Sequence, residues 1–293
     1  MITNANRQYK SSVFAKLFGE KETLLELYNA IKDTNYGSDT EIEITTLDDV
    51  LFKAKINDLS FLIEDKLVVL IEHQSTINEN MPLRMLLYMA RIYEKITKDE
   101  DLYRERRITI PRPEFIVLYN GEKDYPDSQT LKLSEMFKSV NEEYPLNLEL
   151  SVQVFNINKG RNPQFAQKSE NLNGYEEFVA TIRKYEHEGK NAEEAIKSGI
   201  SDCINRNILR SFLEKNSSEV VNMLLTEWNW DTALRVREEE GRALGVQQGM
   251  QQGMKQGMKQ GMKQGVQQGM QQILEFLKNG HTIEEAEKKF ASS

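Results

Sequence analysis

The sequence predicts an α/β core followed by an α-helical region and a repetitive tail. Two apolar strings, at residues 58–65 and 66–75, are joined by a short polar link, which is the pattern of a β-hairpin. Residues 175–230 instead show the three- and four-residue apolar spacing of helices. From Gly241 to Gly269 a glycine recurs at every fourth position, so this last part of the chain differs in kind from the core.

The core begins with a predicted amphipathic helix over residues 11–32, whose apolar side chains recur at three- and four-residue steps. Gly19 is expected to break or bend this helix near its middle, and Ser11 is available as a helix cap. Residues 41–56 are polar and β-branched, which predicts one or two short strands there.

The hairpin follows, with the strings DLSFLIED and KLVVLIEHQS as its two strands. A turn at residues 65 and 66 would place residue 58 roughly opposite residue 73. The second strand is apolar without alternation from Leu67 to Ile71, which indicates burial on both faces of the sheet.

A second helix is predicted over residues 81–97, with Pro82 in its first turn, where proline is tolerated. Residues 113–121 have the apolar run of a buried strand that ends at an Asn-Gly turn, and residues 148–157 alternate as a further strand. Strands mixed with helices, followed by helices alone, are typical of an α/β core with an α-helical region after it.

The tail repeats a unit of the type Gly-Met-Lys-Gln, with four cations and no acid between Gly241 and Gln272. One interpretation is a helix that pairs through its small residues, because glycine lets backbones approach closely. The other is a flexible linker, because each glycine costs a helix about 1 kcal/mol. A final segment carries two short helical patterns around Asn279-Gly280, and Thr282 with Glu285 resembles a capping box.

Composition narrows the class of protein. The chain has 293 residues, 39% hydrophobic and 29% charged, which is the balance of a globular protein. No apolar run approaches the roughly 20 residues of a membrane helix, and the start of the sequence does not read as a signal peptide, so no membrane partner is expected. The single cysteine, Cys203, is expected to be buried, and the cytoplasm is the expected compartment.

Charge gives mixed information about nucleic acid as a partner. The net charge of -8 disfavours it, because DNA-binding proteins gain affinity from cations placed on phosphates. Local distribution decides the contact, however, and residues 84–112 hold eight cations against five acids.

Three polar residues at the ends of the hairpin strands carry the predicted chemistry. Glu72 and Gln74 share one face of their strand because side chains alternate, and Asp58 lies on the neighbouring strand. Two carboxylates that converge in a sheet require a counter-charge, and oxygen ligands suit Mg²⁺. Such a cation activates water and offsets charge in phosphodiester cleavage.

The string from NDLSFLIEDKLVVLIEHQS through the helix MPLRMLLYMARIYEKI resembles the recombination-promoting nuclease / putative transposase family (Rpn, YhgA-like) over roughly residues 7–160. The resemblance implies a PD-(D/E)xK core, a mixed sheet flanked by helices like that of restriction endonucleases. It also implies DNA as partner and Mg²⁺ as cofactor, with Mn²⁺ or Ca²⁺ as alternatives.

Roles for individual residues follow from the resemblance. Asp58 and Glu72 would be the metal-binding acids, the backbone carbonyl of His73 a further metal ligand, and Gln74 the residue that positions water. Gln74 stands where the superfamily often has lysine, and an amide neither carries a positive charge nor takes a proton at neutral pH. Ser11 stands where relatives commonly have an acid.

Arg84 and Tyr88, one helical turn apart, are candidates for holding a phosphate, and covering the sheet is the equal alternative. The side chain of His73 should face away from Glu72, as a core histidine. The predicted domains are a nuclease-like domain (1–160), a helical region (161–240), the repeat (241–272) and a short helical segment (273–293).

The sequence thus favours a metal-dependent DNA endonuclease. A catalytically silent DNA-binding or regulatory module on the same fold is the first alternative. The second is an interaction protein whose repeat tail forms homo-oligomers.

Overall fold

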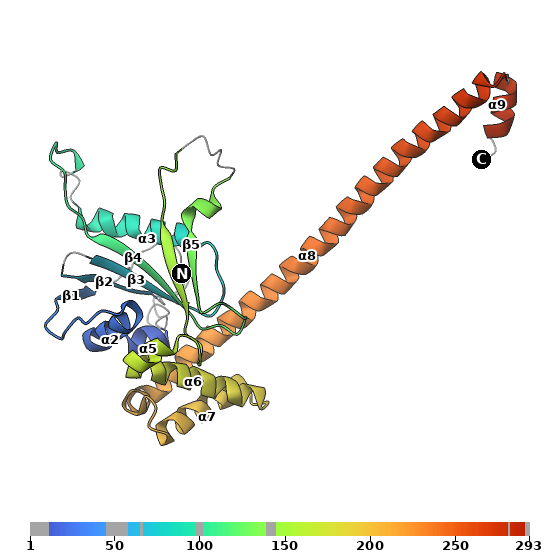
Figure 1. Cartoon of the computed structure of the whole chain (residues 1–293). Helices are drawn as coiled ribbons and strands as arrows, with labels where there is room; N and C mark the ends of the chain where they lie inside the picture. The colour runs from blue at the N-terminus through green and yellow to red at the C-terminus, as the bar shows by residue number, and fades with distance from the viewer. Residues whose placement is uncertain are drawn as a thin grey trace, which may run out of the picture. The chain divides into compact units, whose positions relative to one another are not determined.

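In the computed structural model of this protein, a mixed six-stranded sheet lies between helices (Figure 1). The structure describes residues 12–44, 58–64, 67–97, 102–138, 145–280 and 282–290, apart from the side chains at 58, 67, 68, 70, 228–240, 244 and 288. The strands are β1 (Ile42–Ile44), β2 (Asp58–Ile63), β3 (Leu67–Gln74), β4 (Arg112–Tyr119), β5 (Ser128–Lys132) and β6 (Ser151–Asn156). The helices are α1 (Val13–Leu17), α2 (Lys21–Lys32), α3 (Met81–Ile96), the 3-10 helix η2 (Leu133–Met136), α5 (Pro163–Lys168), α6 (Glu170–His187), α7 (Ala192–Asn205), α8 (Arg210–Lys278) and α9 (Ile283–Phe290).

The strand order is β1-β2-β3-β4-β6-β5. The centre is parallel, because β3, β4 and β6 run the same way, whereas β1–β2, β2–β3 and β5–β6 are antiparallel pairs. A parallel pair needs a crossover, and α3 provides it between β3 and β4. The α/β class and the hairpin are therefore confirmed, and so are the strands predicted at 113–121 and 148–157. The strand β5 has no counterpart among the predictions.

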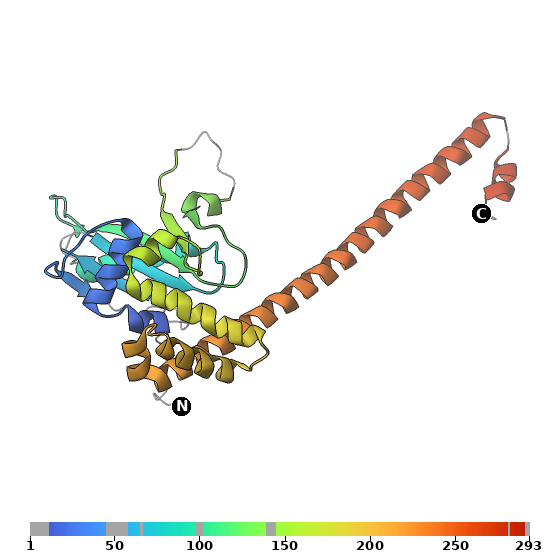
Figure 2. The same ribbon diagram turned by 60° about the horizontal axis from the view of Figure 1, so that its bottom comes forward.

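Two separate cores cover the two faces of the sheet. On one face α3 packs its buried Met85, Met89 and Ile92 against alternate residues of β4 and β6. On the other face α1, α2, α6, α7 and the beginning of α8 share a larger core with Phe61 and Ile71. Figure 2 shows α2 (blue) and α6 (yellow-green) crossing this second face side by side. The helices that follow residue 160 thus complete the core of the sheet.

The first helix divides where the sequence predicts a break. α1 ends at Leu17 and α2 begins at Lys21, with Gly19 between them. The N-cap of α1 is Ser12, whose hydroxyl accepts a hydrogen bond from the Ala15 amide at 3.0 Å. Ser11 lies outside the described residues, as do residues 45–57 of the predicted strand region.

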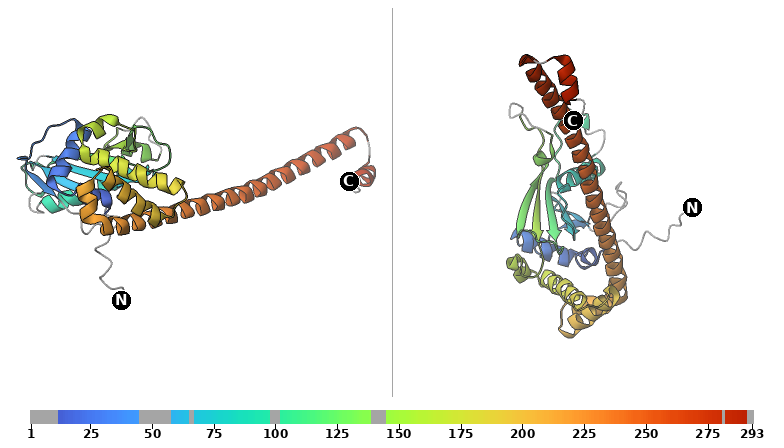
Figure 3. Two further views of the ribbon diagram at one scale, coloured as in Figure 1. Left: turned by 90° about the horizontal axis from the view of Figure 1, so that it is seen from below. Right: turned by 90° about the vertical axis from the view of Figure 1, so that its right-hand side faces the viewer.

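Glu26 of α2 joins this helix to the start of α6. Its carboxylate accepts hydrogen bonds from the Ser169 hydroxyl at 2.7 Å and from the backbone and side-chain amides of Asn171 at 3.1 and 2.6 Å. A carboxylate at the start of a helix satisfies its free N–H groups and its dipole. This contact fixes where α6 begins. Figure 3 (left) shows α6 grouped with α7 and the start of α8.

The chain divides into two compact units, Met1–Asp231 and Thr232–Ser293. Within the second unit the repeat is helical, as part of α8, and its Met250, Met258 and Met262 side chains are exposed. Thr282 and Glu285 form the predicted capping box, with hydrogen bonds of 2.9 and 3.4 Å between them. Among the described helices, none combines the length and apolar character that a membrane crossing requires.

Candidate active site

Glu72 is a buried acid near the carboxyl end of β3. Residues Val69 and Ile71 pack in the larger core, so Glu72 and Gln74 lie on the other face, beneath α3. The Glu72 side chain is only 6% exposed, and a buried carboxylate needs compensating partners. The prediction that Glu72 and Gln74 share a face is confirmed, because their side chains are in contact.

Arg84 of α3 supplies the counter-charge to Glu72. Its Nη1 lies 2.8 Å from Glu72 Oε1 and 3.4 Å from the Met81 sulfur, and its Nη2 donates a hydrogen bond to the Tyr88 hydroxyl at 2.9 Å. Because Met81, Arg84 and Tyr88 are three and four residues apart on α3, they form one side of the site. Arg84 and Tyr88 therefore do lie at the site. The Arg84 side chain is 29% exposed, so it contacts both the buried acid and the solvent.

Gln74 has a fixed orientation in this cluster. Its Nε2 donates to Glu72 Oε1 at 2.5 Å and contacts the Met81 sulfur at 2.9 Å. An ionised carboxylate only accepts hydrogen bonds, so the amide presents its NH₂ group to Glu72 and directs its carbonyl oxygen elsewhere. Gln74 can hold the acid with its nitrogen while its oxygen accepts a hydrogen bond from water.

Asp58 is in register with Glu72. The hairpin closes with Ile63 opposite Leu67, and the Cα of Asp58 pairs with that of Glu72. The sequence predicts residue 58 roughly opposite residue 73, and the observed register differs from this by one residue. The reason is the loop, which spans three residues with Glu64 in the left-handed region (φ 49°) instead of a two-residue turn. The side chain of Asp58 lies outside the part of the structure described.

His73 faces the larger core, as predicted. Its ring stacks on Phe14 with centroids 4.6 Å apart, and its Nε2 lies 3.1 Å from the hydroxyl of the buried Tyr175. Burial raises the pKa of Tyr175, so this hydroxyl stays protonated. His73 and Tyr175 join β3 to α6 directly behind the strand that carries Glu72.

The sequence did not single out the residues on the far side of β4. The Asn120 amide donates to the Gln74 carbonyl at 2.9 Å, so Asn120 lies at the carboxyl end of β3 as well. Arg183 of α6 donates to the Asn120 carbonyl oxygen. The contact of Tyr175 with His73 and the contact of Arg183 with Asn120 join residues that are 102 and 63 positions apart in the chain, and only the position of α6 brings them together.

Gly121 follows at the same edge, where the chain passes close to Ser75. A Cβ atom on Gly121 would clash with the Ser75 carbonyl oxygen and with the Tyr119 hydroxyl. We expect Gly121→Ala to lower the free energy of unfolding by about 1–3 kcal/mol, because this backbone cannot yield freely. Urea unfolding of the wild type and of Gly121→Ala measures this difference in the free energy of unfolding. Gly253→Ala is the control, since no atom lies within 4 Å of its added Cβ and alanine favours helix; equal destabilisation by both would contradict the prediction.

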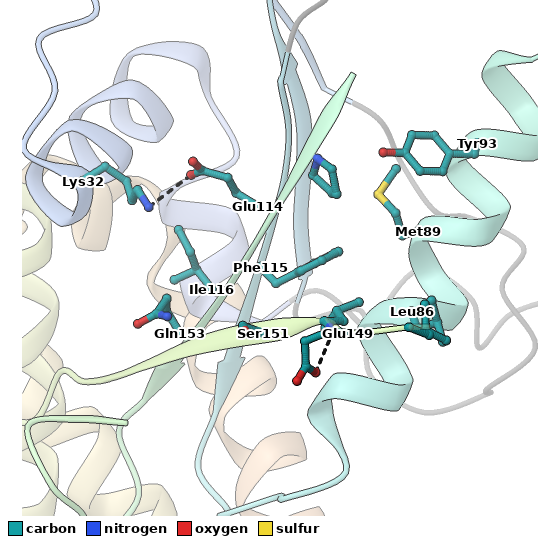
Figure 4. A pocket seen from close by; sticks show the side chains of 13 residues that line it. Lys32, Leu86, Met89, Tyr93, Glu114, Phe115, Ile116, Glu149, Ser151 and Gln153 are labelled. Atoms are coloured by element: carbon teal, nitrogen blue, oxygen red, sulfur yellow. Dashed lines mark hydrogen bonds and ion pairs between the residues drawn. The ribbon is translucent and has the colours of Figure 1, made fainter. Parts of the chain in front are cut away.

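A cavity of about 420 Å³ opens at the opposite end of the sheet, between the beginnings of β4 and β6. Figure 4 shows Met89 and Tyr93 of α3 on one side of β4 and Lys32 with Glu114 on the other. The cavity lies near the amino end of β4, whereas Glu72 lies near the carboxyl end of β3. The cavity and the candidate site are therefore separate places on the sheet.

The chemistry of the donors at the site fits a hard divalent cation. Glu72 and Gln74 offer only oxygen atoms as ligands, and Mg²⁺ prefers oxygen. In the described part of the chain, no three His, Cys, Asp or Glu side chains gather as a metal-binding group. The cation would compete with Arg84 for the same carboxylate oxygen, because both are positive and Arg84 lies 2.8 Å from it.

Comparison with known proteins identifies one relationship. Residues 39–171 match the model of a family described as "Putative transposase, YhgA-like". The matched region includes the hairpin, α3 and the strands β4 to β6, and therefore Asp58, Glu72, Gln74 and Arg84. No curated protein and no solved structure gives a match.

Proposed function

We propose that the chain is a metal-dependent DNA endonuclease associated with recombination or mobile elements, because its residues 39–171 match the model of a family of YhgA-like putative transposases. The proposed core is of the PD-(D/E)xK type. A helix, an antiparallel hairpin, a crossover helix and a parallel strand are the elements that support it.

One observation carries the proposal: Glu72 is a buried acid held by Arg84 and Gln74, in register with a second acid position at residue 58. Directly opposed residues of an antiparallel pair share a face of the sheet, so this register favours convergence of the two positions. An acid that is buried only to stabilise the fold would need no more than the ion pair with Arg84 that neutralises it. A second acid position directly opposite supports a site for a cation.

Each residue has a role in this proposal. Asp58, Glu72 and the His73 carbonyl would hold the cation. When bound, the cation would make water easier to deprotonate and would stabilise the negative charge that develops on the departing oxygen. Gln74 keeps Glu72 in place and accepts a hydrogen bond from water through its carbonyl oxygen. Arg84, the member of the cluster that connects to solvent, would bind a phosphate oxygen next to the acid. The proton of the attacking water would go to solvent, because Gln74 takes none.

The test is cleavage of supercoiled plasmid by the full chain, with Mg²⁺ and with EDTA. We expect nicking that requires Mg²⁺ and that Asp58→Ala removes. Nicking of equal rate by the wild type and by Asp58→Ala would refute the assignment of the site. Nicking that persists in EDTA would refute the need for a cation.

A catalytically silent DNA-binding module is the second candidate, and the ion pair between Arg84 and Glu72 favours it. The guanidinium already neutralises the acid, so the site is stable as it stands. In this case the chain would retain DNA in a mobility-shift assay without cutting it in Mg²⁺, Mn²⁺ or Ca²⁺. Loss of cutting in Asp58→Ala would exclude this candidate.

A further inference from the structure

Arg183 of α6 is a partly buried arginine, and within the described part of the chain its hydrogen bonds go to neutral groups. Its Nη1 donates to Asn158 Oδ1 at 2.7 Å, and its Nη2 donates to the Asn120 carbonyl oxygen. A guanidinium carries five N–H donors, so these two bonds leave others available. The two bonds also fix the plane of the guanidinium, since they anchor both of its terminal nitrogens.

The charge of Arg183 has no carboxylate partner within the described part of the chain. Glu122 is near enough to act with Arg183 on the hydroxyl of Tyr119, and Glu227 acts with it on that of Tyr175, yet among the described residues no ion pair joins either acid to the guanidinium. Five of the other described arginines form ion pairs with acids, namely Arg84, Arg112, Arg161, Arg206 and Arg210, whereas Arg91 resembles Arg183 in having none. A partly buried charge without a counter-charge is costly, and an anion that binds here would offset that cost.

The position of Arg183 is the place where α/β proteins bind ligands. Asn120 follows the carboxyl end of β4, and Asn158 follows the carboxyl end of β6. Ligands of open parallel sheets bind beyond these ends of the strands. The Asn120 amide donates to the Gln74 carbonyl, so Arg183 lies one strand away from the candidate active site at the same edge of the sheet. It approaches this edge from the face that α6 covers, opposite the face on which Glu72 lies beneath α3.

The edge around Arg183 is rigid. The Asn158 amide group donates to the Gly121 carbonyl and to Asn156 Oδ1, both at 2.9 Å. Asn156 in turn donates to the Tyr125 carbonyl at 2.9 Å. A guanidinium held by such a network loses little entropy when it binds a planar oxyanion, which is the property of a preorganised anion site.

We propose that Arg183, held by Asn158 and the Asn120 carbonyl, binds a backbone phosphodiester of nucleic acid beside the candidate active site. This inference rests on the proposed function, because it places a second phosphate of the same strand at the carboxyl edge of the sheet. Arg183 follows the matched region 39–171, so the helical region would contribute to substrate binding.

The test is binding of a fluorescent duplex to the full chain in EDTA, where cleavage does not interfere, over roughly 50–200 mM salt. We expect Arg183→Gln to weaken binding about 5- to 10-fold. The slope of the logarithm of the binding constant against the logarithm of the salt concentration should become shallower by about 1, which corresponds to the loss of one phosphate contact. Arg161→Gln is the matched control, because it removes the same charge from a side chain already paired with Asp124 and Asp127. Arg183→Lys keeps the charge and should keep the salt slope.

An unchanged salt slope in Arg183→Gln, or an equal loss in Arg161→Gln, would overturn the inference. A second measurement uses the wild type alone and so does not depend on the folding of a variant. DNA should protect Arg183, but not Arg161, from an arginine-specific glyoxal reagent, as mapped by mass spectrometry. Equal labelling of Arg183 with and without DNA would overturn the inference, as would protection by inorganic phosphate at matched ionic strength without protection by DNA.

The inference and the proposed function fail in different ways. Plasmid nicking that is independent of Asp58 removes the proposed active site, and binding in EDTA that is independent of Arg183 removes the phosphate site. Each result leaves the other measurement unaffected.

Discussion

Glu72→Gln is expected to abolish metal-dependent cleavage while the protein stays folded. Glutamine has nearly the same shape, and its amide oxygen can still accept the hydrogen bonds of Arg84 and Gln74. It lacks the negative charge that a divalent cation needs, and metal stabilisation of charge is worth several kcal/mol. We expect the cleavage rate to fall about 100-fold or more, since each 1.4 kcal/mol is a factor of ten.

Glu114→Gln is the matched control for this substitution. Glu114 is also a strand carboxylate held by ion pairs, with Lys32 at 3.3 Å and Arg112 at 3.2 Å, and it lies at the other end of the sheet. Cleavage by Glu114→Gln should remain near that of the wild type, with both variants showing the same circular dichroism. Full activity in Glu72→Gln would remove Glu72 from the active site, whatever the behaviour of Asp58.

The second large effect concerns stability and pH, and it arises from Glu176 on α6. Glu176 is 5% exposed, and its Oε1 has no hydrogen-bond partner within the described structure. Burial, with a smaller effect of the neighbouring Glu177 charge, raises the pKa of Glu176 to about 8 from its ordinary value of 4.5. The folded protein therefore keeps this proton over a range of pH in which the unfolded chain releases it.

The sign of the effect follows from this difference. A raised pKa contributes stability that is complete below the unfolded value and is lost as the pH rises to the folded value. Glu176→Gln removes this loss, because glutamine stays neutral. We expect Glu176→Gln to match the wild type near pH 4 and to exceed its free energy of unfolding by about 4–5 kcal/mol near pH 8.5, since each unit of pKa difference is worth about 1.4 kcal/mol.

Glu177 provides a control of opposite sign one residue away. Hydrogen bonding from Lys159, and next from Arg206, lowers the pKa of Glu177, so its contribution is present at neutral pH and lost as the pH falls. Glu177→Gln should therefore destabilise at pH 7 by up to about 1 kcal/mol, since the side chains of both partners are about half exposed to solvent. Urea unfolding at several pH values measures both variants. A gain for Glu176→Gln that does not change with pH would contradict this explanation.

Local patterns were sufficient to predict much of the sheet and part of the site. Unbroken apolar runs predict β3 and β4, because strands covered by helices on both faces need apolar side chains throughout. Alternation alone places Glu72 with Gln74 and turns His73 away from them. The four-residue spacing of Arg84 and Tyr88 predicts that they act together, although it leaves open which face of the helix they occupy.

The register of the hairpin was not predictable in the same way. It depends on whether the loop has two or three residues, and on Glu64 adopting a left-handed conformation that its sequence does not require. A shift of one residue decides whether position 58 accompanies Glu72 or His73. The contacts of Tyr175 and Arg183 were not predictable from the sequence either. They depend on where α6 packs, which is decided by Glu26 and the larger core and not by spacing along the chain.

The tail shows another limit of sequence patterns. The repeat is helical within α8 in spite of its glycines, and its methionines are exposed. Glycine lowers the stability of a helix. A helix without an apolar face packed on a neighbour also gives no information about which partner it binds. Self-association through the repeat stays a prediction, which sedimentation of the full chain against a chain ending near Glu240 would test.

The most direct test of the central claim is the binding of Mn²⁺, measured by electron paramagnetic resonance on the wild type, Glu72→Gln and Glu114→Gln. Bound Mn²⁺ loses the signal of the free ion, so the measurement does not depend on cleavage. We predict that the wild type and Glu114→Gln bind Mn²⁺ alike and that Glu72→Gln loses this binding. Equal Mn²⁺ binding by all three proteins, or none by the wild type, would contradict the account.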